Sequence, residues 1–198
     1  MGVARNPSSL PLVIVPKRHA DARGWFSETF LLDRWHDLGI GCSFVQDNQS
    51  LSTRRGTLRG FHFQEPPSAQ VKLVSVLRGR ILGVAVDIRR GSPSFGKFVS
   101  AELSSDGGRH LFVPIGFAHG FVTLEDDVLV MYKVSEYYAP SCEGGIRWND
   151  PDIDVPWPFD TATLIRSERD DRLPFLKDYQ SPFAYDGKPL TELPTVSL

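Results

Sequence analysis

The sequence predicts an all-β fold, a β-barrel or jelly roll with a few short helices. Short apolar runs follow one another between positions 71 and 137, and turns of Gly, Asp and Ser separate them. Their even spacing favours a barrel or sandwich. With 198 residues, the chain can bury a substantial core. We therefore expect a single domain over residues 1–198, with a barrel core at about 45–140 and an irregular C-terminal wrap at about 148–198.

The N-terminal part contains the first strand and the best helix candidate. Residues 1–10 look like a loose leader, the apolar run at 12–16 predicts a strand, and 17–24 reads as a polar turn. Between 28 and 39, apolar side chains recur near helical spacing, at Phe30, Leu31, Trp35 and Leu38. Gly39 is placed to end this helix.

The middle of the chain reads as β structure. Predicted strands lie at 71–77, 81–88, 97–103, 110–114, 120–124 and 128–137. The Arg-Gly-Arg at 78–80 and the Ser, Asp and Gly at 104–108 are typical of hairpin connections. After Trp148 the chain is rich in Pro and Asp, which predicts a packed but irregular wrap.

Composition excludes several functional classes. The chain has 24 acidic residues against 22 Lys and Arg, for a formal charge of -2, so a general affinity for nucleic acid or an anionic membrane surface is not expected. The cysteines Cys42 and Cys142 have no metal-binding spacing and form no disulfide framework, which favours a reducing cytoplasm. We find neither a membrane span nor a signal peptide, so we expect a soluble, unprocessed protein.

Two His-containing segments are the most informative motifs, at 59–64 (RGFHFQ) and 114–120 (PIGFAHG). In barrels of the cupin type, segments like these carry metal ligands, with a second His and a carboxylate nearby. This chain has Gln64 and Lys72 instead. A protonated ammonium does not ligate a metal and repels a divalent cation, so a site with His62, Lys72 and His119 suits an anionic organic substrate. We expect acid–base chemistry without a metal or cofactor.

Each candidate residue also has a structural interpretation. Lys72 shares its predicted strand face with Val74 and Val76, and either extends to an edge or serves a site. Tyr132 lies among valines, as a core tyrosine with its hydroxyl at the rim would. His62 is predicted to share a face with Leu58, Gly60 and Gln64, where the glycine leaves room for a ligand or another backbone.

The combination of motifs is more specific than any one of them. His62, Lys72, His119 and Tyr132 occur together with the segments 21–29 (DARGWFSET), 46–48 (QDN) and 146–151 (IRWNDP). This pattern, in this order from about residue 12 to 174, closely resembles the dTDP-4-dehydrorhamnose 3,5-epimerase family. The resemblance implies a cupin-type barrel that inverts C3 and C5 of a dTDP-linked 4-keto-6-deoxyhexose, without redox cofactor or metal.

The resemblance also implies catalytic roles. His62 matches the family base that removes the proton next to the ketone, and Asp170 matches the carboxylate that orients this His. Tyr132 matches the acid on the other face of the sugar. Lys72 and His119 are the candidates to stabilise the enolate oxygen.

Further residues match positions that contact the nucleotide sugar in similar proteins: Arg23, Phe26, Glu28, Gln46, Asn48, Arg59, Tyr138, Glu143 and Arg169. Arg59 is the preferred diphosphate ligand, because a guanidinium binds phosphate oxygens through two hydrogen bonds. Tyr138 matches a tyrosine that stacks on thymine. Arg169 replaces the usual Lys of the family, which changes its reach. The resemblance implies a homodimer in which the N-terminal segment with Arg23 crosses to the partner subunit.

Three alternatives stay open. The first is an epimerase that inverts C3 or C5 alone for another deoxysugar, using the same His and Tyr. The second is a sugar-nucleotide-binding cupin without catalysis, against which the joint presence of His62, Asp170 and Tyr132 argues. The third is a metal-dependent cupin oxygenase, which Gln64 and Lys72 disfavour.

Overall fold

The computed structural model describes residues 9–198, so most of the predicted leader at 1–10 lies outside the described residues. The strands are β1 (Leu12–Val15), β2 (Arg18–Asp21), β3 (Gly24–Ser27), β4 (Gln46–Ser52), β5 (Leu58–Gln64), β6 (Lys72–Arg78), β7 (Arg80–Asp87), β8 (Phe98–Ser104), β9 (His110–Val113), β10 (Phe117–Thr123), β11 (Val128–Val134), β12 (Glu143–Gly145) and β13 (Thr195–Ser197). The helices are α1 (Leu32–Asp37) and α2 (Glu168–Asp171), and the 3-10 turns are η1 (Pro140–Cys142), η2 (Thr161–Thr163) and η3 (Leu176–Asp178).

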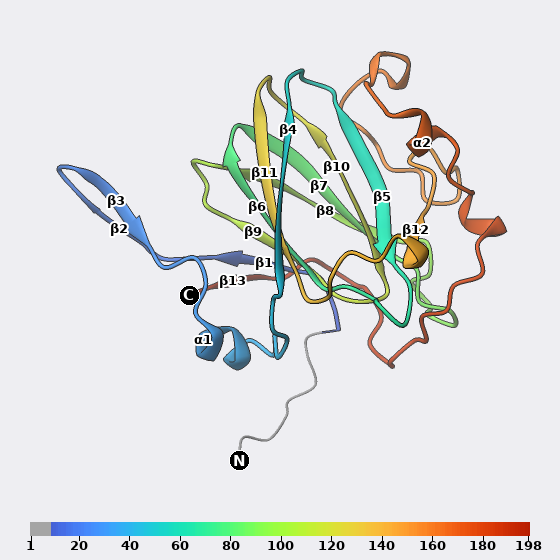
Figure 1. Ribbon diagram of the computed structural model, residues 1–198, viewed down its shortest axis with the longest axis horizontal. Coiled ribbons are helices and arrows are strands. Elements are labelled where there is room, and N and C mark those ends of the chain that lie inside the picture. Colours follow the sequence, from blue (N-terminus) through green and yellow to red (C-terminus); the bar gives the residue numbers. More distant parts are fainter. Residues whose placement is uncertain (1–8) are drawn as a thin grey trace.

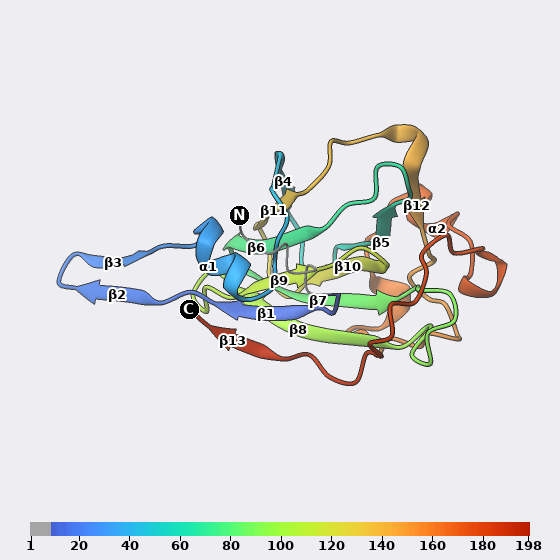
Figure 2. The ribbon, with the colours of Figure 1, turned by 90° about the horizontal axis from the view of Figure 1, so that it is seen from below.

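Two sheets face each other and confirm the predicted jelly roll. One has six strands in the order β13-β1-β9-β6-β11-β4, and the other has five in the order β12-β5-β10-β7-β8. The hairpin β2–β3 projects away from the two sheets, while α2 lies on the opposite side (Figures 1 and 2). The C-terminal segment runs from that side back to β13, which pairs with β1. Within residues 9–198, no helix is long and apolar enough to cross a membrane.

The core confirms the predicted alternation along β6. Val74 and Val76 point between the sheets, into an apolar cluster that also contains residues of β7 to β11. Leu73 faces the other way and packs in a second cluster with Trp35. Lys72 is the first residue of β6, on the same face as Val74 and Val76, and it is only partly buried.

The two predicted hairpin connections are wrong. Arg78 ends β6 in the six-stranded sheet, whereas Arg80 begins β7 in the five-stranded sheet. Likewise, β8 and β9 belong to different sheets, so the turn at 104–108 also crosses between them. Turn composition predicts a change of direction, but it does not say which sheet the next strand joins.

The N-terminal predictions need two corrections. Residues 17–24 are no simple turn, because β2 and β3 pair as an antiparallel hairpin within 18–27. The helix predicted at 28–39 is shorter, with only Leu32–Asp37 helical, no side-chain cap at its start, and Gly39 just beyond its end at φ +79°. Trp35 is its buried residue and explains the apolar signal.

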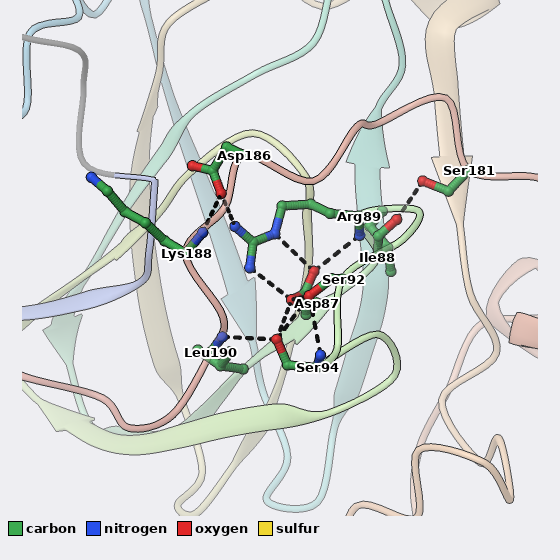
Figure 3. Close-up of polar contacts among 9 residues, drawn as sticks. All are labelled: Asp87, Ile88, Arg89, Ser92, Ser94, Ser181, Asp186, Lys188 and Leu190. Atoms are coloured by element: carbon green, nitrogen blue, oxygen red, sulfur yellow. Dashed lines mark hydrogen bonds and ion pairs between the residues drawn. The ribbon is translucent and has the colours of Figure 1, made fainter.

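Buried charges fasten the C-terminal segment to the barrel (Figure 3). Arg89 makes two hydrogen bonds to Asp87, at 2.9 and 2.7 Å, and a third to Asp186 at 2.8 Å. Ser94 donates to Asp87 and accepts from the amide of Leu190, each at 2.8 Å. The side chain of Leu190 then enters the apolar cluster between the sheets.

Candidate active site

A cavity of about 480 Å³ opens between the two sheets. Several strands, the segment before α2 and α2 itself contribute to its wall, through Ser50, Thr57, Leu58, Arg59, His62, Lys72, His119, Phe121, Tyr132, Ile165, Arg166, Ser167, Arg169 and Asp170. A second cavity, of about 220 Å³, includes Gln46, Asn48, Gln64, Tyr138 and Glu143 in its wall. His62, Lys72 and Tyr132 line both cavities, so these three side chains lie where the two meet.

A β-bulge brings Arg59 and His62 to the same cavity. In the pairing of β10 with β5, His119 lies opposite His62 and Phe121 lies opposite Arg59, so β5 has one more residue in this interval. The predicted face shared by His62 and Gly60 is therefore wrong. Gly60 instead allows the close approach of β10, because a Cβ there would lie 2.5 Å from the Cα of Gly120.

His62 and Asp170 form a dyad. Nε2 of His62 lies 2.7 Å from Oδ1 of Asp170, whose side chain is 5% exposed against 30% for His62. An ionised carboxylate accepts hydrogen bonds, so it favours the tautomer with the proton on Nε2. The lone pair of a neutral His62 is then on Nδ1, which makes Nδ1 the atom able to take a proton.

Lys72 is held beside the dyad. Its Nζ donates to the backbone carbonyl of His62 at 3.0 Å. Burial lowers the pKa of Lys72 to about 8, although the carboxylate of Glu143 acts in the opposite direction. Lys72 is therefore mostly a cation at neutral pH, and it can donate a hydrogen bond to an oxygen that becomes negative.

His119 and Tyr132 complete the interior wall. Burial, followed by the charges of Lys72 and His62, lowers the pKa of His119 to about 3, so its imidazole is neutral. Its Nε2 is buried and has no hydrogen-bond partner among the described residues. Burial also raises the pKa of Tyr132, which keeps its phenol protonated and able to donate a proton.

Polar side chains around the second cavity form a connected network. Glu143 accepts from Arg169 at 2.6 Å and from the Tyr138 hydroxyl at 2.8 Å. Gln46 accepts from the Tyr138 amide at 3.0 Å and donates to Asn48 at 2.8 Å. Burial alone would raise the pKa of Glu143, but the hydrogen bonds from Arg169 and Tyr138 hold it below its usual value.

The donor set does not suggest a metal centre. Among the described residues, no group of three or more His, Cys, Asp or Glu side chains is arranged to hold a metal ion. Gln64 stands where a metal-binding cupin would have its second His. It is buried and fixes the backbone near Tyr138, since its amide donates to the Tyr137 carbonyl and accepts from the Ala139 amide.

The sequence model of the dTDP-4-dehydrorhamnose 3,5-epimerase family matches residues 10–178. The chain belongs to this family. A curated dTDP-4-dehydrorhamnose 3,5-epimerase from Sinorhizobium fredii is 47% identical over 174 residues, which cover 87% of this chain and 88% of the relative. The family assignment that the motifs implied is thus confirmed, and the chain is an epimerase of the dTDP-4-dehydrorhamnose 3,5-epimerase family.

Solved structures agree with this assignment. The dTDP-6-deoxy-D-glucose-3,5-epimerase from Legionella pneumophila in complex with dTDP-4-keto-L-rhamnose is 38% identical, with a TM-score of 0.84 and coverage of 92% of this chain and 98% of that chain. A 3'-monoepimerase from Streptomyces bikiniensis, in complex with dTDP-quinovose, is 33% identical, with a TM-score of 0.78 and coverage of 87% of both chains.

Three of the predicted site residues of this epimerase lie outside both cavities. Arg23, Phe26 and Glu28 are on or just after the hairpin β2–β3. Arg23 pairs with Asp21 at 2.6 Å, and Glu28 pairs with Arg34 at 3.2 Å. Phe26 is 71% exposed. The fold of one chain therefore does not bring these three side chains to the dyad.

Other residues of the epimerase site were not predicted. The cavity wall also includes Ser50, Thr57, Phe121, Ile165 and Arg166. Ser50 is on β4, two residues beyond Asn48 and hence on the same strand face, so strand alternation could have indicated it. Arg166 and Ile165 come from the irregular wrap, where no periodic signal indicates which side chains face the barrel.

Proposed function

We propose that this epimerase inverts C3 and C5 of dTDP-4-dehydro-6-deoxy-D-glucose to give dTDP-4-dehydro-L-rhamnose. The observation that carries this proposal is the His62–Asp170 dyad, at 2.7 Å, in one cavity with Lys72 and Tyr132. A base, an acid and a cation around one space are what proton removal and return next to a ketone require. The names of the relatives supply the substrate.

In this mechanism, Nδ1 of His62 takes the proton from the carbon next to the C4 ketone, and Asp170 stabilises the resulting imidazolium. The electrons of the broken C–H bond move to the C4 oxygen. Lys72 stabilises this enolate as a cation, and neutral His119 does so as a hydrogen-bond donor from Nε2. Tyr132 then returns a proton to the opposite face of the same carbon. Proton exchange with solvent restores His62 and Tyr132 before the second carbon reacts.

The nucleotide part of the substrate is assigned to the network around the second cavity. Tyr138 is 54% exposed, which leaves its ring available to stack on thymine. Arg59 donates to Ser52 and to the Leu51 carbonyl, both at 3.2 Å, and these contacts orient its guanidinium at the cavity wall for the diphosphate. Gln46, Asn48, Glu143 and Arg169 complete this set.

The same proposal includes a homodimer in which Arg23, Phe26 and Glu28 complete the partner's pocket. The outer face of the six-stranded sheet supports it, because Leu51 and Leu77 there are 48% and 46% exposed. A partner subunit on this face would cover these apolar side chains. Cys42 and Cys142 are free thiols, which supports a cytoplasmic setting.

A single-position epimerase is the second candidate, because the matched 3'-monoepimerase shares the fold with a TM-score of 0.78. Proton NMR of dTDP-4-dehydro-6-deoxy-D-glucose with the enzyme in D₂O separates the two. A rhamnose-forming reductase traps the epimerised product. Deuterium at both C3 and C5 of the trapped product supports the double epimerase, and deuterium at one carbon excludes it. A folded, dTDP-binding enzyme that exchanges neither proton would refute catalysis on this substrate.

A further inference from the structure

The segment around Trp148 helps to identify the family, but the proposed mechanism gives it no role. Trp148 lies in the wrap beyond β12, is 5% exposed, and packs with Leu58, Val122 and Leu164. Its indole N–H donates to Oδ1 of Asp171 at 2.8 Å. This hydrogen bond points directly at the helix that carries the dyad carboxylate.

Helix α2 needs such contacts, because it has only four residues, Glu168–Asp171. A helix this short is not stable by itself. On its exposed side, Glu168 pairs with Arg172, and these side chains are 86% and 78% exposed. Such an exposed pair contributes little to the position of the helix. Arg169 pairs with Glu143, in the wall of the second cavity, at 2.6 Å. The direction in which Asp170 points must therefore come from contacts with the rest of the protein.

On the side of the helix toward the wrap, Asp171 provides the side-chain contact of this kind. Oδ1 of Asp171 accepts from the Trp148 indole at 2.8 Å and from Nε of Arg166 at 3.0 Å. The guanidinium of Arg166 lies over the Trp148 ring, 4.7 Å from its centroid, so the three side chains form one cluster. The Trp148 hydrogen bond, with a further contribution from Arg166, holds the pKa of Asp171 below its usual value.

The start of the helix is fixed separately. Ile165 exchanges backbone hydrogen bonds with β5 and the residues before it, accepting from the Leu58 amide at 2.8 Å and donating to the Gly56 carbonyl at 2.9 Å. Ser167 caps the helix by accepting from the Asp170 amide at 3.1 Å. These contacts set where α2 begins, and two side-chain contacts remain to fix its rotation, the Arg169–Glu143 pair and the Asp171 cluster.

We propose that Asp171, held by Trp148 and Arg166, is a positioning residue that rotates α2 so that Asp170 meets His62. The kinetic consequence of this inference rests on the proposed epimerase mechanism. Asp170 and Asp171 are adjacent, so a rotation of the short helix moves both carboxylates. A displacement of about 1 Å at a catalytic group costs on the order of 10²-fold in rate.

The test compares Asp171→Ala with Glu168→Ala, which removes a carboxylate from the same helix but leaves the Trp148 cluster intact. We expect Asp171→Ala to lower kcat by about 10²-fold. KM changes by a smaller factor, because the same rotation moves Arg169, which is assigned to the nucleotide. Glu168→Ala keeps the wild-type kcat. Asp171→Asn retains an oxygen that accepts from Trp148, and we expect it to restore most of the rate.

The second readout is independent of substrate. NMR of ¹⁵N-labelled protein follows the proton on Nε2 of His62, which exchanges slowly when it is bonded to Asp170. We expect this signal to be lost in Asp171→Ala and in Trp148→Phe, which lacks the indole N–H, and to persist in Glu168→Ala. Trp148→Phe replaces Asp171→Ala if the latter does not fold.

The outcomes distinguish this inference from the proposed function. A wild-type kcat together with an intact His62 signal in Asp171→Ala would overturn the positioning role. A wild-type enzyme that exchanges neither the C3 nor the C5 proton would overturn the proposed function, and the His62 signal would then decide the positioning role alone.

Discussion

Lys72 makes the site sensitive to pH. Its ammonium is the proposed cation at the enolate oxygen, and burial lowers its pKa to about 8, opposed by Glu143. A lowered lysine pKa means that the charge is present below about pH 8 and is lost above it. We expect kcat/KM to fall as pH rises through this value. In Glu143→Gln the fall should begin at lower pH, because the carboxylate that supports the cation is gone.

The control for this profile is Lys133→Met, which removes a lysine paired with Asp47 at 2.8 Å outside both cavities. Its pH profile should match that of the wild type. If kcat/KM of Lys72→Met still falls at the same alkaline pH, a group other than Lys72 causes the fall. Because kcat/KM reports the free enzyme, the measurement uses substrate concentrations well below KM.

The two faces of the sugar can be tested separately. Tyr132→Phe removes the proposed acid but leaves the His62–Asp170 dyad, so we expect solvent deuterium to enter the substrate without inversion. His62→Ala removes the base, and both exchange and inversion should fall by about 10²- to 10⁴-fold. Both are measured by NMR in D₂O. Inversion at the wild-type rate in Tyr132→Phe would rule out Tyr132 as the acid.

For single residues, prediction of the strand face succeeds where the strands are regular. Alternation predicts the correct strand faces for Lys72 and Tyr132, because β6 and β11 pair without a register shift over 72–76 and 130–134. Tyr132 lies opposite Asn48 and Val74 in the sheet. Arg59 shares the cavity with His62 through a bulge, which depends on how β5 pairs with β10. Pairing between distant strands is a tertiary property that the local pattern does not contain.

Among the elements, β4 shows why a strand at a binding site can escape prediction. Its residues Gln46, Asn48 and Ser50 alternate with exposed residues, but the partly buried face is polar because it lines the cavities. A search for apolar alternation therefore finds no strand there. The polar side chains that line the cavities are therefore also the reason why the sequence pattern does not indicate this strand. The irregular wrap offers no period either, and the position of Asp170 followed only from the family resemblance.

The buried network in Figure 3 should be the main fastening of the C-terminal segment to the barrel. Asp87 and Arg89 are 0% and 3% exposed. Replacing Asp87 by Ala leaves the Arg89 charge buried with only Asp186 as a partner. We expect a loss of about 3–5 kcal/mol in the free energy of unfolding, as for other broken buried pairs. Urea unfolding measures this loss, and Asp160→Ala, at an exposed cap in the same wrap, is the control.

The same network predicts a dependence of stability on acid. Burial alone would raise the pKa of Asp87, but hydrogen bonds from Arg89, Ser92 and Ser94 hold it below the usual 3.8. The pKa of Asp87 is lower in the folded than in the unfolded chain. The stabilisation by the Asp87 carboxylate is therefore complete above about pH 4 and is lost as pH falls through the folded pKa. The difference in unfolding free energy between wild type and Asp87→Ala should therefore shrink in acid. An unchanged difference would contradict the assignment.

On the scale of the whole molecule, the hairpin β2–β3 is an arm whose base is fixed and whose tip is free. Arg18 binds the Ser105 carbonyl at 2.6 Å and lies over the Trp25 ring at 3.9 Å. Phe26, which pairs with His19 near the base of the hairpin, is 71% exposed, and the hairpin projects from the barrel in both views (Figures 1 and 2). An ordered arm that exposes large apolar residues suits insertion into a second copy of the chain.

Subunit exchange can be tested by complementation. One chain carries Arg23→Ala and Phe26→Ala on the hairpin, and the other carries His62→Ala in the cavity. If each hairpin completes the partner's pocket, a mixed dimer contains one site with a normal dyad and a normal hairpin. Two differently tagged chains are co-expressed and the mixed dimers purified through both tags. We expect mixed dimers to recover activity that both parent homodimers lack. If each hairpin instead completes the pocket of its own subunit, the only intact dyad lies in the chain with the altered hairpin. Mixed dimers are then as impaired as the hairpin variant.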